Sequence, residues 1–389
     1  MHLQFENRIK TAYKFVIFML FLNSMHPWYI WTNQLFLITI GIGALCSIAI
    51  LCLRNPFRLS KEDVGLFFIL LIYSLFECLK SNINGIIQNI ALFVVWWGLL
   101  SLNNEDRKEY INYITKWFSI LLLISLFTYL LWLFDIWNIE PTEIEYKDVG
   151  YSASNYITFI IQNDGRLTNF FRFMSIFAEP GHMTMGIVPL IILNNFNLKN
   201  KYVLILFIAE IWSFSLAGMI TLFIGYVLFN FNKHLIKGLA YLILACSGLV
   251  IMFESLGYGD VIEVFLWSRL EVNDDGNIAG NNRFTSQVDT EYNKLFNSID
   301  FLCGKEVDQN IIDGSAGYKV FIIQNGLVGL ILAISIYSYY FLKYKTYRLF
   351  IVTVIYLLLL TQNSYPTWMC MLAPYLLGAP LPKRQLTQV

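Results

Sequence analysis

The stretch VGLFFILLIYSLFECLKSNINGIIQNIALFVVWWGLLS, residues 64–101, decides the fold class. It holds two apolar runs separated by a short polar turn, and each run approaches the roughly 20 residues that a helix needs to cross the hydrocarbon core of a bilayer. Similar runs recur along the chain, and together they predict about twelve membrane-spanning helices at 11–27, 34–53, 64–80, 83–101, 113–137, 176–194, 202–216, 217–232, 236–254, 316–342, 346–361 and 365–380. We therefore expect an all-α polytopic membrane protein in which residues 1–389 form a single transmembrane domain.

The composition agrees with a membrane protein and excludes several other classes. Of the 389 residues, 57% are hydrophobic and 14% are charged, whereas a soluble domain carries about 25% charged residues. The 27 basic and 27 acidic residues give a net charge of zero, which argues against a nucleic-acid-binding protein and against a disordered chain. The sequence contains neither a Walker-type phosphate loop nor a Rossmann fingerprint, which excludes a transporter subunit with its own ATP-driven motor.

The distribution of charge predicts how the chain is oriented. Most of the basic residues lie on alternate short connections between the predicted spans, among them Arg54, Arg107 and Arg348. The positive-inside rule assigns these connections to the cytoplasm. With twelve spans, both termini are then cytoplasmic, and the outer half of the protein is rich in acidic residues.

Two long connections, at about 138–175 and 254–315, fall on the outer side. Loops of this length are usually functional or disordered. In the second loop, the apolar residues of 288–301 recur at helical spacing, and 261–270 is typical of an interfacial segment. We expect both loops to contain short helices and to cap the outer end of the helix bundle. Of six cysteines, only Cys303 lies on this side, so the sequence predicts neither a disulfide framework nor a metal site.

The densest group of reactive side chains lies in Arg172-Phe-Met-Ser-Ile-Phe-Ala-Glu179-Pro180-Gly181-His182, where the first outer loop enters the sixth span. A continuous helix would place Arg172, Glu179 and His182 on one face. Pro180 instead favours a helix that begins at the proline with Glu179 as its cap. Because ionisable groups at the membrane are costly, we regard all three as candidate catalytic residues. The alternative is a structural ion pair between Arg172 and Glu179, with His182 as a hydrogen-bonded structural residue.

The remaining candidates would bind an anion. Guanidinium groups form bidentate, charge-assisted hydrogen bonds with phosphates, and the outer loops offer Arg166, Arg269 and Arg283 beside Arg172. The tenth span is preceded by a glycine-rich turn that could bring backbone N–H groups close to an anion. Its candidate substrate-binding residues are Gly314, Ser315, Gly317 and Lys319. The alternatives are ion pairs with the acidic loops and an ordinary helix cap. Within the spans, Glu77 and Glu210 could line a polar cavity or form hydrogen bonds between helices.

The run RFMSIFAEPGH resembles the signature of bacterial O-antigen polymerases of the Wzy type. The later pattern is similar as well: Arg269 within Ser-Arg-Leu, then Arg283, Gly304, the glycines of 314–317, and QNGLVG at 324–329. The resemblance implies a C-class glycosyltransferase-like fold in the bacterial inner membrane, with the active site on the periplasmic side. It also implies an undecaprenyl-diphosphate-linked glycan donor and acceptor, and polymerisation of repeat units into O-antigen or capsule-like polysaccharide.

The same resemblance supplies roles and partners. Arg172 and Glu179 match the family's Arg and Glu-Pro positions, and Arg269 and Arg283 match the arginines of its large loop. A chain-length regulator protein and a flippase are implied partners beside the membrane lipids, and no cofactor is implied. Two alternatives stay open. O-antigen ligases, which transfer finished glycan to lipid A core, share the same plan. A lipid-linked oligosaccharide flippase would also fit twelve spans, although long acidic outer loops and the absence of paired repeats disfavour it.

Overall fold

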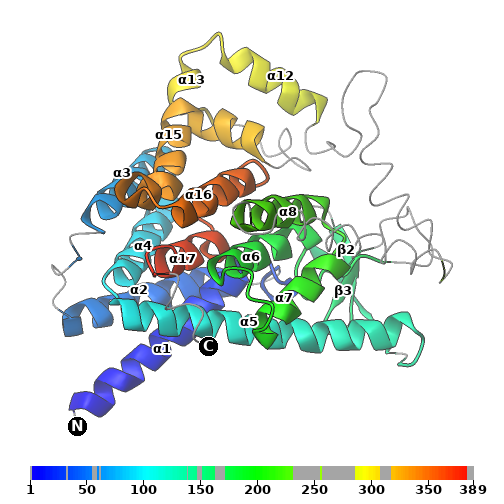
Figure 1. Ribbon diagram of the computed structural model, residues 1–389. Helices are drawn as coiled ribbons and strands as arrows, with labels where there is room; N and C mark the ends of the chain where they lie inside the picture. Colours follow the sequence, from blue (N-terminus) through cyan, green and yellow to red (C-terminus); the bar gives the residue numbers. More distant parts are fainter. Residues whose placement is uncertain are drawn as a thin grey trace.

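The computed structural model describes residues 2–31, 34–54, 59–60, 63–137, 139–146, 151–162, 171–230, 255, 285–306 and 317–382. These residues form a helical bundle with a small sheet on one side (Figure 1). The helices of the first half are α1 His2–Asn23, η1 Trp28–Ile30, α2 Leu35–Arg54, α3 Val64–Lys80, α4 Ile83–Leu100 and α5 Asn104–Leu133. Those that follow are α6 Pro180–Leu193, α7 Lys201–Trp212, α8 Leu216–Asn230, α12 Ser286–Leu295, α13 Asp300–Cys303, α15 Tyr318–Tyr344, α16 Tyr347–Leu360 and α17 Met369–Gly378.

The predicted fold class, a helical membrane protein, is confirmed. Eleven of the twelve predicted spans contain a helix, and the remaining one, 236–254, lies outside the described residues. Within the described ranges, four helices are long and apolar enough to cross a membrane: 35–53, 83–100, 104–133 and 318–344. Several other apolar helices have 10–17 residues. The number of twelve spans therefore stays a prediction.

The outer faces of the first helices are apolar, as expected for contact with lipid. On α3, the exposed residues Phe68, Ile72, Leu75 and Leu79 recur at helical spacing along one face. On α4, Ile87 is 62% exposed. A soluble monomer seldom exposes such a continuous apolar surface. Hydrocarbon chains are the environment that suits it.

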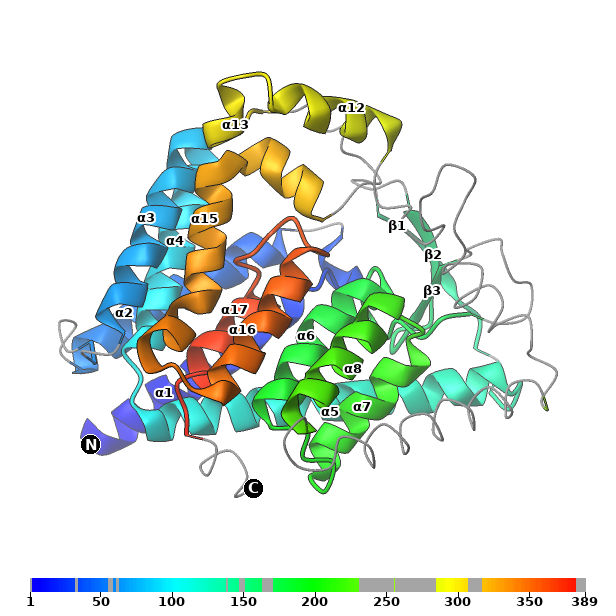
Figure 2. The same cartoon turned by 45° about the horizontal axis from the view of Figure 1, so that its top comes forward.

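The core of the bundle is formed by α6 and α17, which lie side by side in the middle of the molecule (Figures 1 and 2). Every residue of α17 is buried, and so are all residues of α6 from Met183 to Leu193. Because these residues are buried by protein, α6 and α17 are surrounded by other helices and do not face lipid. Because α6 begins at Pro180 and α17 at Met369, the starts of these two central helices define the location of the candidate site.

The first outer loop forms a three-stranded antiparallel sheet, so the prediction of short helices there is wrong. The strands are β1 Thr142–Tyr146, β2 Tyr151–Asn155 and β3 Ile160–Gln162, in the order β1-β2-β3. In β2, Ala153 and Asn155 are buried while Ser152 and Ser154 are not. This alternation is the period of a strand, and serine and threonine side chains favour it over a helix.

The second outer loop contains the predicted helices, but they are shorter than expected. Thr285 caps α12 by accepting the N–H of Val288 through Oγ1 at 3.3 Å, and α12 ends at Leu295 instead of continuing to 301. The interfacial segment predicted at 261–270 lies outside the described residues. Figure 2 shows α12 and α13 lying across the first part of α15, far from the start of α1.

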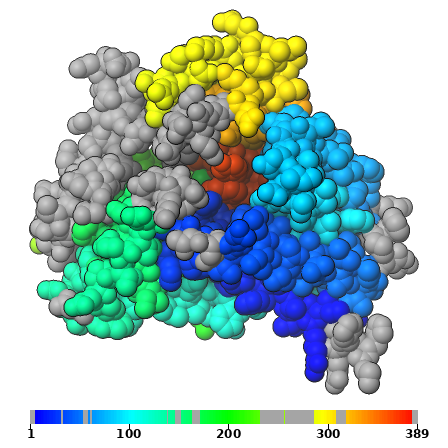
Figure 3. Space-filling model, turned by 180° about the vertical axis from the view of Figure 1, so that it is seen from behind, coloured from blue at the N-terminus to red at the C-terminus, as the bar shows by residue number. Residues whose placement is uncertain are grey.

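A break in α15 allows α13 to approach closely. Gly326 has a φ of 60° and interrupts the helix, and Gly304 after α13 has a φ of 78°. The N–H of Lys305 donates to the carbonyl of Ile323 at 2.9 Å. A Cβ at position 326 would lie 2.6 Å from the backbone of Leu302, so only glycine fits this contact. Seen from behind, the surface is hollowed between α12–α13 (yellow) and α3–α4 (blue to cyan), with the chain towards the C-terminus (red) at the bottom of the hollow (Figure 3).

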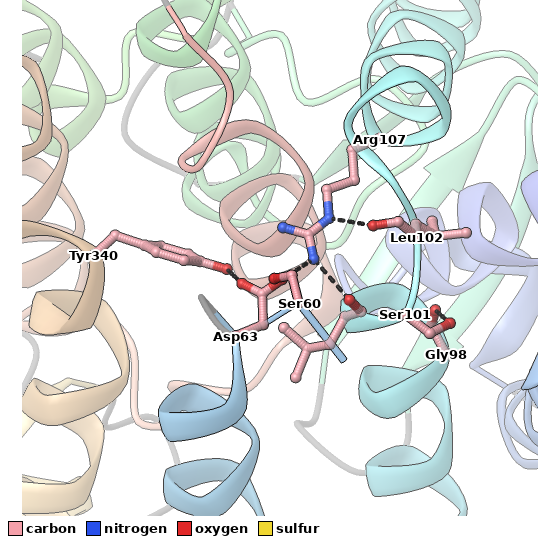
Figure 4. Close-up of polar contacts among 8 residues, drawn as sticks. Ser60, Asp63, Gly98, Ser101, Leu102, Arg107 and Tyr340 are labelled. Atoms are coloured by element: carbon pink, nitrogen blue, oxygen red, sulfur yellow. Dashed lines mark hydrogen bonds and ion pairs between the residues drawn. The ribbon is translucent and has the colours of Figure 1, made fainter. Parts of the chain in front are cut away.

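A buried ion pair joins the start of α3 to the first turn of α5 (Figure 4). Arg107 pairs with Asp63, and the two side chains are each 3% exposed. Tyr340 donates to the same carboxylate at 2.8 Å, and Arg107 also donates to the carbonyls of Leu100 at 2.7 Å and Leu102 at 2.9 Å. Because both carboxylate oxygens and two guanidinium nitrogens have partners, much of the desolvation of this pair is compensated. Arg107, one of the predicted cytoplasmic arginines, is therefore a structural residue.

Candidate active site at the start of the central helices

Residues 173–178, which precede α6, are buried and non-helical, with a turn at 175–176. Backbone hydrogen bonds fix it from two sides: the N–H of Trp28 donates to Ile176 at 2.9 Å, and the N–H of Ile160 donates to Ser175 at 2.8 Å. The helix begins at Pro180 with Glu179 as the N-cap residue, at φ −146° and ψ 151°. The predicted start at the proline is confirmed, and the alternative of one continuous helix through Arg172 is wrong. Glu179 and His182 therefore belong to the first turn of α6, and Arg172 belongs to the non-helical chain before it.

Arg172 lies near a carboxylate that is distant from it in the sequence. The Nε atom of Arg172 donates to the carbonyl of Ser213, at the end of α7, at 3.3 Å. Its guanidinium also acts electrostatically on the carboxylate of Glu210, one turn earlier in α7. Glu210 is completely buried. The structure thus places the predicted catalytic arginine near a buried glutamate 38 positions further along the chain, through its hydrogen bond to Ser213.

One carboxylate oxygen of Glu210 accepts a hydrogen bond, and the other has no donor among the described residues. Thr184, in α6, donates through Oγ1 to Glu210 Oε1 at 2.7 Å. Glu210 Oε2 is buried and has no hydrogen-bond partner within the described part of the chain. Gly218, in α8, lies so close that a Cβ there would be 2.8 Å from Cδ of Glu210. Three helices therefore position this carboxylate beside Arg172.

Three aromatic rings gather at the start of α6. The ring centroids of His182 and His26 are 5.3 Å apart, and that of Trp368 lies 5.3 Å from His182 and 5.2 Å from His26. His26 precedes η1, and Trp368 is the N-cap of α17. Sequence reasoning missed both residues, although a histidine directly before Pro27 at the end of the first span is a signal that could have marked His26.

Of the other predicted site residues, the structure describes Gly317 and Lys319, and both lie at the start of α15. Gly317 caps α15 with a φ of 103°, which agrees with a glycine-requiring turn. Lys319 donates to Asp289 of α12 at 2.7 Å and lies 5.6 Å from the ring centroid of Tyr292, so it connects two outer helices. Arg166, Arg269, Arg283, Gly314 and Ser315 lie outside the described residues.

An ion pair joins α12 to the chain that follows α13. Hydrogen bonds from Lys294 and Lys305 lower the pKa of Glu291 to about 2. Lys305 lies after α13, at 2.5 Å from the Glu291 carboxylate, and Lys294 lies one turn from it at 2.9 Å. Among the described residues, no group of three or more His, Cys, Asp or Glu side chains could hold a metal ion.

No family model, curated protein or solved structure matches the chain. The chemistry of the site is accordingly inferred from its residues. A guanidinium stabilises an anion or a leaving group with negative charge. A carboxylate and an imidazole within one helical turn, Glu179 and His182, supply groups that accept a proton from a hydroxyl. The combination suits a transfer reaction in which an anion leaves and a hydroxyl attacks.

Proposed function

We propose that this chain is a glycosyltransferase that polymerises oligosaccharide repeat units carried on undecaprenyl diphosphate, at the outer face of the bacterial inner membrane. The observation that carries the proposal is the position of Arg172, which donates to the carbonyl of Ser213 one turn after the buried Glu210. Thr184 of α6 donates to Glu210, and Glu179 and His182 lie at the start of the same helix. The resemblance of 172–182 to O-antigen polymerases supplies the reaction. In this proposal the bundle has twelve spans and a C-class glycosyltransferase-like plan, and both termini are cytoplasmic.

The proposed mechanism is one group transfer. A hydroxyl of the acceptor repeat unit attacks the anomeric carbon of the donor glycan, and Glu179 accepts the hydroxyl proton, with His182 as the second candidate base. The bond between the anomeric carbon and the diphosphate oxygen breaks, and the electron pair leaves with the lipid diphosphate. Arg172, together with Arg269 and Arg283 of the second loop, stabilises the charge on this leaving group.

The buried carboxylate has a positioning role in this mechanism. Thr184 fixes the carboxylate of Glu210, and Glu210 in turn attracts the guanidinium of Arg172. A preorganised cation stabilises a developing negative charge better than a mobile one, because little reorganisation is needed during the reaction. Two protein partners are proposed. A flippase brings repeat units to the outer face, and a chain-length regulator protein determines where the polymer ends.

The test is polymerisation by the purified chain in proteoliposomes, with the lipid-linked repeat unit supplied on the outer face only. Loss of a preorganised donor costs about 10²–10³ in rate, so Arg172→Ala should lower polymerisation about 100-fold or more. Glu179→Gln should have a comparable effect, because general-base catalysis contributes about 10²–10⁴. The matched control is Glu143→Gln, an exposed carboxylate in β1 that accepts a hydrogen bond from Ser154. It should retain normal activity.

Two results would contradict the proposal. Full polymerisation by Arg172→Ala would remove the assigned role of the site. Failure of the wild-type chain to form polymer from outer-face substrate would favour the other classes, and a deletion strain separates them. Loss of a polymerase leaves surface glycan one repeat long, whereas loss of a ligase leaves lipid A core without glycan and lets lipid-linked polymer accumulate.

A further inference from the structure

A second polar cluster lies at the end of α3, outside the site already described. Glu77 is one turn before Lys80, and its Oε1 atom is buried with no hydrogen-bond partner among the described residues. The hydroxyl of Tyr73 forms hydrogen bonds with Glu77 and with Thr367 in the loop before α17. A buried carboxylate oxygen without a donor is costly. Such an oxygen is satisfied when a ligand supplies a hydroxyl or an amide.

The break in α15 completes the cluster. Lys80 donates through Nζ to Oδ1 of Asn325, the residue before the interruption at Gly326, and lies 4.8 Å from the ring centroid of Phe76. Lys80 and Asn325 therefore place an ammonium group and an amide at the end of α3, one turn after Glu77.

A row of aromatic rings connects this cluster to the start of α6. Tyr365 interacts electrostatically with Glu77, and its ring stacks on Trp368 at 5.5 Å with an interplanar angle of 10°. Trp368 in turn contacts His182 at 5.3 Å. Tyr365 is 47% exposed, so this ring pair offers a surface that a ligand can reach. The C-terminal part of the chain is visible at the bottom of the hollow beside α3 and α4 (Figure 3).

We infer that the cluster of Glu77, Lys80, Asn325 and Tyr365 binds a neutral saccharide. Sugar hydroxyls both donate and accept hydrogen bonds, which matches a carboxylate beside an ammonium and an amide. The ring faces of Tyr365 and Trp368 suit the C–H faces of a sugar ring. The carboxylate of Glu77 disfavours a phosphate by like-charge repulsion, so the diphosphate belongs to the Arg172 side. The identity of the saccharide as the acceptor repeat unit rests on the proposed function.

The probe is the repeat unit released from its lipid carrier by mild acid and labelled with a fluorophore at the reducing end. Binding to the purified full chain in detergent is measured by fluorescence anisotropy. Glu77→Gln and Tyr365→Ala should each weaken binding at least tenfold. Glu109→Gln, a carboxylate paired with Lys14 on another part of the surface, is the matched control and should bind normally. Arg172→Ala should also bind normally, because the free glycan carries no diphosphate.

The outcomes separate this inference from the proposed function. If the wild-type chain binds the glycan and Glu77→Gln does not, but no polymer forms in proteoliposomes, the saccharide site stands and the polymerase proposal fails. If polymer forms while both variants bind like the wild type, the saccharide site is refuted. Absence of wild-type binding up to millimolar glycan, or displacement of the glycan by inorganic pyrophosphate, also refutes it. The side chain of Tyr365 is 47% exposed, so Tyr365→Ala keeps the test valid even where Glu77→Gln fails to fold.

Discussion

The substitution Gly218→Ala should displace Glu210 without removing any charged group. A Cβ at position 218 would lie 2.8 Å from Cδ of Glu210 and 2.8 Å from Cγ2 of Thr184. Both side chains are buried in a contact between α6, α7 and α8, so the added methyl group cannot be accommodated by a turn towards solvent. The carboxylate must move away, so its hydrogen bond from Thr184 is lost and its electrostatic interaction with Arg172 is weakened.

The expected loss of stability follows from three contributions. Overpacking of a buried site costs about 1–3 kcal/mol, and loss of a hydrogen bond to a charged acceptor costs about 1.5–3 kcal/mol. Replacement of a helical glycine by alanine returns about 1 kcal/mol. The net destabilisation by Gly218→Ala should therefore be about 2–5 kcal/mol. Polymerisation should fall towards the level of Arg172→Ala, because the carboxylate near the guanidinium is displaced.

The assay is reversible unfolding in mixed detergent micelles, with Gly41→Ala as the matched control. A Cβ at position 41, in α2, meets no atom within 4 Å, so this variant should be neutral or up to about 1 kcal/mol more stable. Combining Gly218→Ala with Glu210→Ala should remove the clash with Glu210 and leave only that with Thr184, so Gly218→Ala should cost less stability in the Glu210→Ala background than in the wild type. If Gly218→Ala unfolds like Gly41→Ala and keeps normal activity, the described packing around Glu210 is refuted.

Three further predictions concern the helix contacts outside the candidate site. Arg107→Met should destabilise the chain by about 3–5 kcal/mol because it leaves the buried Asp63 unpaired, and adding Asp63→Asn should recover part of this loss in the same unfolding assay. The pKa of Glu291 is lowered to about 2, so its contact with Lys305 contributes fully to stability above the ordinary carboxyl pKa of 4.5 and is lost as the pH falls towards 2. Hydrogen exchange of α12 should therefore rise over this range. In Lys305→Met this exchange should depend less on pH. Gly326→Ala should destabilise the contact of α13 with α15 by about 2 kcal/mol, since the left-handed φ and the close backbone both oppose a side chain; unchanged hydrogen exchange of α13 would contradict this.

The helices could be predicted from the sequence because long apolar runs leave few alternatives in a membrane. Pro180 also fixed the start of α6 correctly, since its ring fits the first turn and opposes a helical residue before it. The sheet of the first outer loop could not be predicted. Its strands have three to five residues and carry more polar than apolar side chains, so their pairing depends on the neighbouring chain and not on a local pattern.

The contacts between residues of the candidate site were the feature hardest to predict from the sequence. Arg172 and Glu210 are far apart in the sequence and meet because α6, α7 and α8 pack together around Gly218. No local pattern encodes such a contact, although a glutamate inside an apolar span marks Glu210 as unusual. His26 is equally distant from His182 in the sequence, and only the docking of the chain before η1 against the segment before α6 brings them together.

A comparison of Arg172 with Arg107 and Arg348 distinguishes the candidate site from ordinary capping of a helix C-terminus. Arg107 donates to carbonyls at the end of α4, and Arg348 donates to Gly378 at 3.2 Å and Ala379 at 2.9 Å at the end of α17. Arg172 likewise donates to a carbonyl at the end of α7. All three therefore stabilise a helix C-terminus, where a cation is favoured by the helix dipole. Capping alone does not indicate catalysis. Arg172 differs because its neighbour is a buried carboxylate with one oxygen unpartnered among the described residues, beside the two groups able to accept a proton. That difference predicts that Arg348→Ala lowers stability and activity together, whereas Arg172→Lys, which keeps the charge but not the fork, lowers activity more than stability.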